Sequence, residues 1–119
     1  MKTGGLRLPH RVQARVDKTK ICDYLLNPEH RNGGSKAKLF LQLGFNRKNW
    51  RRLQHALCVH AQSHPVVSMV ETPFGPQFVI EGSLQCPDGR QIQVRSVWQI
   101  DVGKIAPRLI TSYPLEQKL

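Results

Sequence analysis

The 119-residue sequence lacks several features that would place it in well-known classes. Its three cysteines, Cys22, Cys58 and Cys86, form no CxxC pair, which argues against a zinc site or a disulfide framework and for a reducing compartment. No run of about twenty apolar residues is present, and the N-terminus has no apolar signal-peptide core. The sequence therefore predicts a cytoplasmic protein that makes no use of a membrane.

Common catalytic signatures are also missing. The sequence has no GxSxG, no P-loop, no dinucleotide fingerprint and no HExxH. His55, His60 and His64 share no metal-binding face, because only the last two have i, i+4 spacing, and they are interpreted as surface or helix-end histidines. We therefore predict no metal and no cofactor.

Acidic residues are scarce. Eight of them stand against 18 Lys and Arg, and the net charge is +10. All of the excess lies in residues 1–64, with 13 basic and three acidic residues, whereas residues 65–119 hold five of each. The excess favours a polyanionic partner. A nucleic-acid surface, an anionic-membrane surface and a solvated basic face all stay open, but no basic amphipathic helix of membrane type supports the second.

The first half of the chain has helical periodicity. Residues 1–16 are basic, contain two glycines and a proline, and predict a loose arm or a short edge segment. Helices are predicted over 18–26, 36–43 and 47–61, with Asp17, Ser35 and Asn46 as their N-caps. Apolar residues at 50, 53, 57 and 61 mark the third helix as the main core helix. The loop 27–35 between the first two helices carries His30.

The second half alternates between apolar and polar residues. Strands are predicted over 66–71, 77–85, 91–101 and 108–113, joined by short links that make neighbouring strands antiparallel. The predicted fold class is α+β, in which the N-terminal helices pack on one face of a four-stranded antiparallel meander. Residues 17–115 are expected to form a single domain.

The other face of this sheet is predicted to be polar. Pairing the two middle strands symmetrically about Asp88 places Leu84 opposite Ile92 and Phe78 opposite Trp98 on the apolar face. The same register places Glu81 opposite Arg95 on the polar face. Such a pair is either an ordinary surface ion pair, which adds little stability, or part of a site.

Metal-free RNA cleavage fits the residue types available. It needs a base for the 2′-hydroxyl, cations for the phosphorane and an acid for the leaving 5′-oxygen. The candidate catalytic residues are His30, Lys36, Glu81, Arg95, Thr111 and Tyr113. The candidate RNA-binding residues are Lys38, Arg47, Lys48, Arg51, Arg52, Arg108 and Ser112.

Several segments resemble a known family. They are DYLLNPEH at 23–30, SKAKLFLQLGF at 35–45, PDGR at 87–90, VRSVW at 94–98 and PRLITSYP at 107–114. Together they resemble a bacterial family of unknown function that occurs as a small stand-alone protein and as a terminal domain of polymorphic toxins. The closing strands, one with Arg and the next ending in Thr-x-Tyr-Pro, are also similar to the metal-independent toxin ribonucleases of the barnase, EndoU, colicin and RelE fold group.

This resemblance implies a function and a partner. His30 and Lys36 would match the basic residues of the helical half, and Arg95 with residues 111–113 would match the active-site strands. The protein would be a ribonuclease of a toxin–antitoxin or polymorphic toxin system that cleaves tRNA or mRNA. An acidic antitoxin or immunity protein would cover the polar sheet face. The alternatives are a non-catalytic RNA-binding or protein-interaction module and, with less support, an inhibitor or structural component of a phage-like or secretion assembly.

Overall fold

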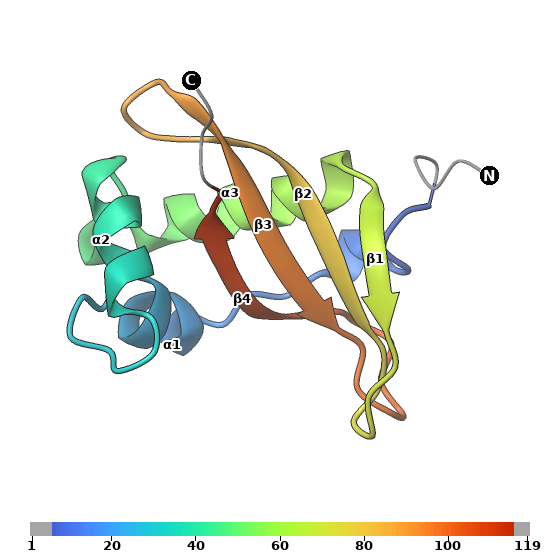
Figure 1. The fold of residues 1–119 in the computed structure, drawn as a ribbon. Coiled ribbons are helices and arrows are strands. Elements are labelled where there is room, and N and C mark those ends of the chain that lie inside the picture. The colour runs from blue at the N-terminus through green and yellow to red at the C-terminus, as the bar shows by residue number, and fades with distance from the viewer. Residues whose placement is uncertain (1–5, 116–119) are drawn as a thin grey trace.

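The sheet predicted from the alternation is present. A computed structural model describes residues 6–115, and Figure 1 shows its four strands with the helices on one side. The strand order is β1-β2-β3-β4, with each strand antiparallel to the next. The bounds are Val66–Val70 for β1, Gln77–Gln85 for β2, Gln91–Gln99 for β3 and Arg108–Pro114 for β4. The predicted α+β class and meander order are therefore confirmed.

The helices precede the sheet in the chain. Their bounds are Arg11–Gln13 for η1, Lys18–Lys20 for α1, Ile21–Leu25 for η2, Gly34–Gln42 for α2, Arg47–Asn49 for η3 and Trp50–Ser63 for α3. In Figure 1, α3 crosses behind the strands and α2 stands beside β4. None of the helices among residues 6–115 is long and apolar enough to cross a bilayer.

The start of the long helix follows the prediction. Asn46 and Asn49 form a capping box, in which each side chain accepts a hydrogen bond from the other residue's backbone N–H. From there α3 buries Leu53, Leu57 and Ala61 against the sheet. The capping box fixes where the main core helix begins.

The first two helices differ from the prediction. Instead of a regular helix over 18–26, a π-helical turn, η2, follows α1, and the Leu26 N–H bonds to the Ile21 carbonyl. The helix α2 begins at Gly34, with Gly33 rather than Ser35 at the N-cap. A Cβ on Gly34 would lie 2.4 Å from the Pro28 carbonyl oxygen, so the chain before α2 folds tightly on itself.

The two faces of the sheet are distinct. Phe78, Ile80, Leu84, Val94 and Trp98 are buried against the helices. The predicted pairs are confirmed, because Leu84 pairs with Ile92, Phe78 with Trp98 and Glu81 with Arg95. The odd-numbered residues of β2 and β3 therefore lie on the opposite face, which we call the open face.

Residues 6–16 pack against the sheet rather than forming a loose arm. The Leu6 carbonyl accepts a hydrogen bond from the Val66 N–H at β1, and Arg15 pairs in parallel with Arg108 at β4. Leu8, between these contacts, and Val16, directly after them, are buried in the core. The segment thus runs from one edge of the sheet to the other, as Figure 1 shows. Residues 1–5 of the predicted arm lie outside the described residues.

A buried histidine joins α3 to the sheet, which corrects its interpretation as a surface or helix-end residue. His60 is 1% exposed. Its Nε2 lies 3.1 Å from the Gly82 carbonyl oxygen and 3.0 Å from that of Val94, so Nε2 carries the proton. Its Nδ1 lies 3.0 Å from Ser96 Oγ, which also accepts a hydrogen bond from the Trp98 indole. Every polar atom of this buried group is paired.

Burial, with a smaller effect of nearby His64, lowers the pKa of His60 against the opposing effect of the two backbone hydrogen bonds, and the net pKa is about 4. The unfolded chain binds a proton at His60 near pH 6.5, whereas the folded chain does so only near pH 4. Stability contributed by neutral His60 is therefore full above about pH 6.5 and is lost as the pH falls towards 4.

We expect the free energy of unfolding of the wild type to fall by roughly 3 kcal/mol from this one residue between pH 7 and pH 4. Urea denaturation at a series of pH values measures it. In His60→Gln this pH-dependent loss should be absent, whereas His55→Gln, on the exposed side of α3, should keep it. Identical pH profiles for wild type and His60→Gln would contradict the assignment.

Candidate active site on the open face

Three side chains form a row across the open face. Glu81, Arg95 and Tyr113 occupy paired positions on β2, β3 and β4. The Arg95 Nε donates a hydrogen bond to Glu81 Oε2 at 2.7 Å, and its Nη1 donates to the Tyr113 hydroxyl at 2.9 Å. The side chains of Arg95 and Glu81 are 39% and 31% exposed, so the row is open to a ligand.

Hydrogen bonds stabilise the protonated form of Arg95. The bond to Glu81 raises the pKa of the Arg95 guanidinium, and the bond to Tyr113 raises it further, against a small opposing effect of burial. Arg95 is thus a permanent cation, held in one orientation by partners on both neighbouring strands. A fixed, charged guanidinium fork is well suited to bind phosphate.

A lysine from the helical half joins this row. The Lys36 Nζ lies 4.5 Å from the centre of the Tyr113 ring, and the Arg95 Cζ lies 5.7 Å from the same ring. Lys36 is on α2, which stands beside β4 in Figure 1. Two cations therefore flank one phenol, each held in part by the ring face.

The remaining two predicted catalytic residues meet through a tyrosine. The hydroxyls of Thr111 and Tyr24 share a hydrogen bond of 2.7 Å, and the rings of Tyr24 and His30 pack edge to face with centroids 4.8 Å apart. The His30 Nδ1 accepts hydrogen bonds from the backbone N–H groups of Asn32 and Gly33. Neutral His30 therefore carries its proton on Nε2 and can donate a hydrogen bond from that atom.

The six predicted catalytic residues thus form two groups, and each group contains one residue of β4, Thr111 or Tyr113. Thr111 and Tyr113 lie two residues apart on the same face of the strand, a separation of about 7 Å. One group contains Glu81, Arg95, Tyr113 and Lys36, and the other contains Thr111, Tyr24 and His30.

Ser112 does not belong to this site, contrary to the prediction. It is fully buried and donates a hydrogen bond to the Arg95 carbonyl oxygen. The two-residue period of β4 places Thr111 and Tyr113 on the open face and turns the residue between them to the helices. Ser112 accordingly pairs with the buried Ser96.

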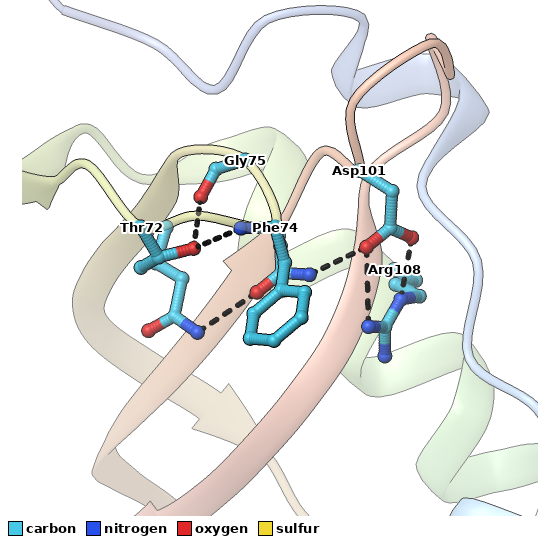
Figure 2. Close-up of polar contacts among 7 residues, drawn as sticks. Thr72, Phe74, Gly75, Asp101 and Arg108 are labelled. Carbon is cyan, nitrogen blue, oxygen red and sulfur yellow. Dashed lines mark hydrogen bonds and ion pairs between the residues drawn. The ribbon is translucent and has the colours of Figure 1, made fainter.

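Arg108 lies at the end of the open face where β3 ends and β4 begins, and it forms an ion pair. Figure 2 shows its guanidinium bonded to the Asp101 carboxylate, with Nε to Oδ2 at 2.7 Å. This bond lowers the pKa of Asp101 and raises that of Arg108. Gln99 donates to the same carboxylate and accepts from Gln77. Arg108 is thus held by a carboxylate in the same way as Arg95, and its contact with RNA stays a prediction.

The turn beside this network is held by side-chain hydrogen bonds and a tightly packed glycine. Figure 2 shows the Thr72 hydroxyl donating to the Gly75 carbonyl and accepting from the Phe74 N–H. Gly75 has a φ of +129°, and a Cβ there would lie 2.1 Å from the Ile100 carbonyl oxygen, so only glycine fits. The polar network and the turn therefore occupy the same end of the sheet, where their polar groups are bonded to one another rather than left for a ligand.

The other predicted RNA-binding residues lie in the helical layer. Lys38 is exposed on α2, and the remaining four, Arg47, Lys48, Arg51 and Arg52, are exposed on η3 and α3. Figure 1 shows α3 behind the sheet, so these four cations belong to the layer on the side opposite the open face. A groove beside α3, lined by Arg51, Arg52, His55 and apolar residues that include Val59, likewise lies apart from the row.

Within residues 6–115, no cluster of His, Cys, Asp and Glu has the composition to hold a metal ion. The prediction that the site uses no metal remains a prediction.

Comparison with known proteins gives the family. Residues 7–116 match the family described as Domain of unknown function (DUF6883). The chain belongs to this family. No curated protein matches the sequence.

One solved structure has a similar fold. It is a chain of the "Contact-dependent growth inhibition toxin - immunity protein complex from Klebsiella pneumoniae 342", with a TM-score of 0.70 and 16% sequence identity. The match covers 90% of this DUF6883 chain and 97% of that chain. At this identity the likeness shows a shared fold.

Tyr24 was missed as a site residue. Its helical spacing with Ile21 and Leu25 indicates a residue that faces the core. Its ring is partly buried against the core, but its hydroxyl reaches Thr111, 87 residues away. No local pattern identifies that contact, because it depends on how the π-helical turn η2 meets β4.

We expect the Glu81–Arg95 pair to contribute little to the stability of the DUF6883 domain. Both side chains are about a third exposed, so water screens their attraction. Glu81→Gln should lower the free energy of unfolding by less than about 1 kcal/mol in urea denaturation. Ile80→Ala, the buried neighbour on β2, should cost about 2–5 kcal/mol and shows that the assay responds. If Glu81→Gln lowered the free energy of unfolding as much as Ile80→Ala does, the row would serve mainly to stabilise the fold.

Proposed function

We propose that this DUF6883 domain is a metal-independent endoribonuclease that acts as a toxin on cytoplasmic RNA. The observation that carries the proposal is the row on the open face, where Arg95 and Lys36 flank the Tyr113 ring beside the carboxylate of Glu81. This combination offers cations, a phenol and a carboxylate on one accessible surface. The net charge of +10 supplies attraction for a polyanion.

The reaction would proceed without a cofactor. The 2′-oxygen of a ribose attacks the adjacent phosphorus, a new P–O2′ bond forms and the P–O5′ bond breaks. The proton of the 2′-hydroxyl passes to a base and the leaving 5′-oxygen receives a proton. The products are a 2′,3′-cyclic phosphate and a 5′-hydroxyl, so atoms and charge balance.

The side chains fit these roles. Arg95 and Lys36 would stabilise the negative charge that develops on the phosphorane. Glu81 would accept a proton or hydrogen bond from the RNA. Arg95 binds its Oε2, and the carboxylate keeps further lone pairs that can accept. His30 would donate from Nε2 to a phosphoryl oxygen, since its Nδ1 is occupied by backbone N–H groups. Tyr113, already oriented by Arg95, would donate to the departing oxygen.

Two further observations support a place in a toxin–immunity system, and the proposal takes the toxin's role from the basic charge and the row on the open face. The similar fold comes from a complex of a growth inhibition toxin with its immunity protein. The sequence resembles a family found in polymorphic toxins and the ribonucleases of the barnase, EndoU, colicin and RelE group. A basic toxin of this kind would be neutralised by an acidic immunity protein or antitoxin that covers the open face.

We expect the purified domain to cleave RNA in the presence of a chelator. His30→Ala, Arg95→Ala and Tyr113→Phe should each reduce the rate by roughly 10²-fold or more, the typical contribution of an acid–base or charge-stabilising group. Arg90→Ala, which removes a surface arginine bound to Asp88 at the β2–β3 turn, is the matched control and should keep full activity. Gel analysis of labelled RNA measures the rates.

Two outcomes of that assay would overturn the proposal. Undiminished cleavage by all three variants would place the active site elsewhere. Binding of RNA that depends on salt but yields no product would favour the alternative, a non-catalytic RNA-binding module. The exposed cations of η3 and α3, which belong to the helical layer, are the observation that supports this alternative.

The contribution of those cations can be measured separately. Uncleavable 2′-O-methyl RNA is bound at several salt concentrations by wild type and by a variant with Arg47, Lys48, Arg51 and Arg52 changed to Gln. If these residues bind phosphates, the slope of log affinity against log salt should decrease by about 0.7 for each phosphate that the variant no longer neutralises. An unchanged slope would show that this surface is merely solvated.

A further inference from the structure

Tyr24 occupies an unusual position in the chain. It lies in the π-helical turn η2, and such turns occur often at functional sites. Its hydroxyl shares a hydrogen bond with Thr111 on β4, and its ring packs edge to face on His30. One side chain therefore contacts both the sheet and the loop that carries His30.

The loop is built around the Tyr24 ring. A Cβ on Gly33 would lie 2.5 Å from the Tyr24 Cε1, so the backbone of the loop packs directly on the ring. Gly33 is also one of the two residues whose N–H groups bond to the His30 Nδ1. The Tyr24 ring thus supports the loop backbone, and that backbone in turn binds the Nδ1 of His30.

Core packing alone does not account for these contacts. A phenylalanine would fill the same volume and keep the packing with His30 and Gly33. Only the hydroxyl reaches Thr111, two residues before Tyr113 on the same face of β4. The hydroxyl therefore fixes the distance between His30 and the Lys36–Arg95–Tyr113 group.

We propose that Tyr24 is a positioning residue, whose hydrogen bond to Thr111 holds His30 in register with the cations of the open face. The inference rests on the proposed ribonuclease function. Tyr24 itself does not contact the reacting atoms in this arrangement. It acts through His30, and the hydrogen bond across the two halves of the chain is what couples the helical half of the site to the sheet half.

Tyr24→Phe tests this inference because it removes only the hydroxyl. We expect kcat for RNA cleavage to fall by about tenfold or more, since small displacements of a catalytic group have large effects, and KM to change less than twofold. The imidazole resonances of His30 in NMR spectra should shift, whereas those of His55, exposed on α3, should not. Thr111→Val removes the same bond from the other side, and the double variant should be no slower than the slower single variant.

The matched control is Thr72→Val. It also deletes a hydroxyl that donates a hydrogen bond, to the Gly75 carbonyl in the β1–β2 turn, and it should leave kcat unchanged.

The outcomes separate the inference from the proposed function. If Arg95→Ala and His30→Ala are inactive but Tyr24→Phe has wild-type kcat, the positioning role is wrong and the ribonuclease stands. If kcat falls while the His30 resonances stay in place, Tyr24 acts by another route and the inference also fails. If Arg95→Ala and His30→Ala cleave like wild type, the active site lies elsewhere and the positioning role fails with it. If the wild type itself cleaves no RNA, the proposed function fails, and a shift of the His30 resonances in Tyr24→Phe would support only the structural link.

Discussion

The register of the three strands β2, β3 and β4 is the constraint on which the site depends. Glu81, Arg95 and Tyr113 meet because they occupy paired positions, and the same pairing turns Phe78, Trp98 and the other apolar residues towards the helices. A slip of one residue would exchange the two faces of a strand. The core and the candidate site are therefore specified together, and the apolar residues that stabilise the fold also hold the row in place.

Buried polar contacts reinforce this register. His60 reaches from α3 to the backbone of both β2 and β3, and Ser96 links it to the Trp98 indole. Such a network is satisfied in one arrangement only, since each buried donor that lost its acceptor would carry a desolvation cost. On the other side of the molecule, the Tyr24 hydroxyl ties the helical half to β4. The sheet is thus held to the helices by directional contacts as well as by apolar packing.

Much of this arrangement could be predicted from periodicity. The alternation of β2 and β3 and the turn at Pro87-Asp88-Gly89 were enough to place Glu81 beside Arg95. The same pattern could not place His60 or Tyr24. An imidazole at helical spacing is compatible with both surface and core, and its burial depends on carbonyl groups that come from other strands. Ser112 was assigned to the site for its chemistry, although the alternation of its own strand already turned it inward.

The ion pairs give the open face an uneven charge. At one end Asp101 holds Arg108, and the tight turn at Thr72–Gly75 lies beside it. At the middle of β2 and β3 Glu81 holds Arg95, but among the ion pairs of residues 6–115 none includes Lys36. The cation without a carboxylate partner therefore lies where α2 meets β4, which favours the approach of an anion from that side of the sheet.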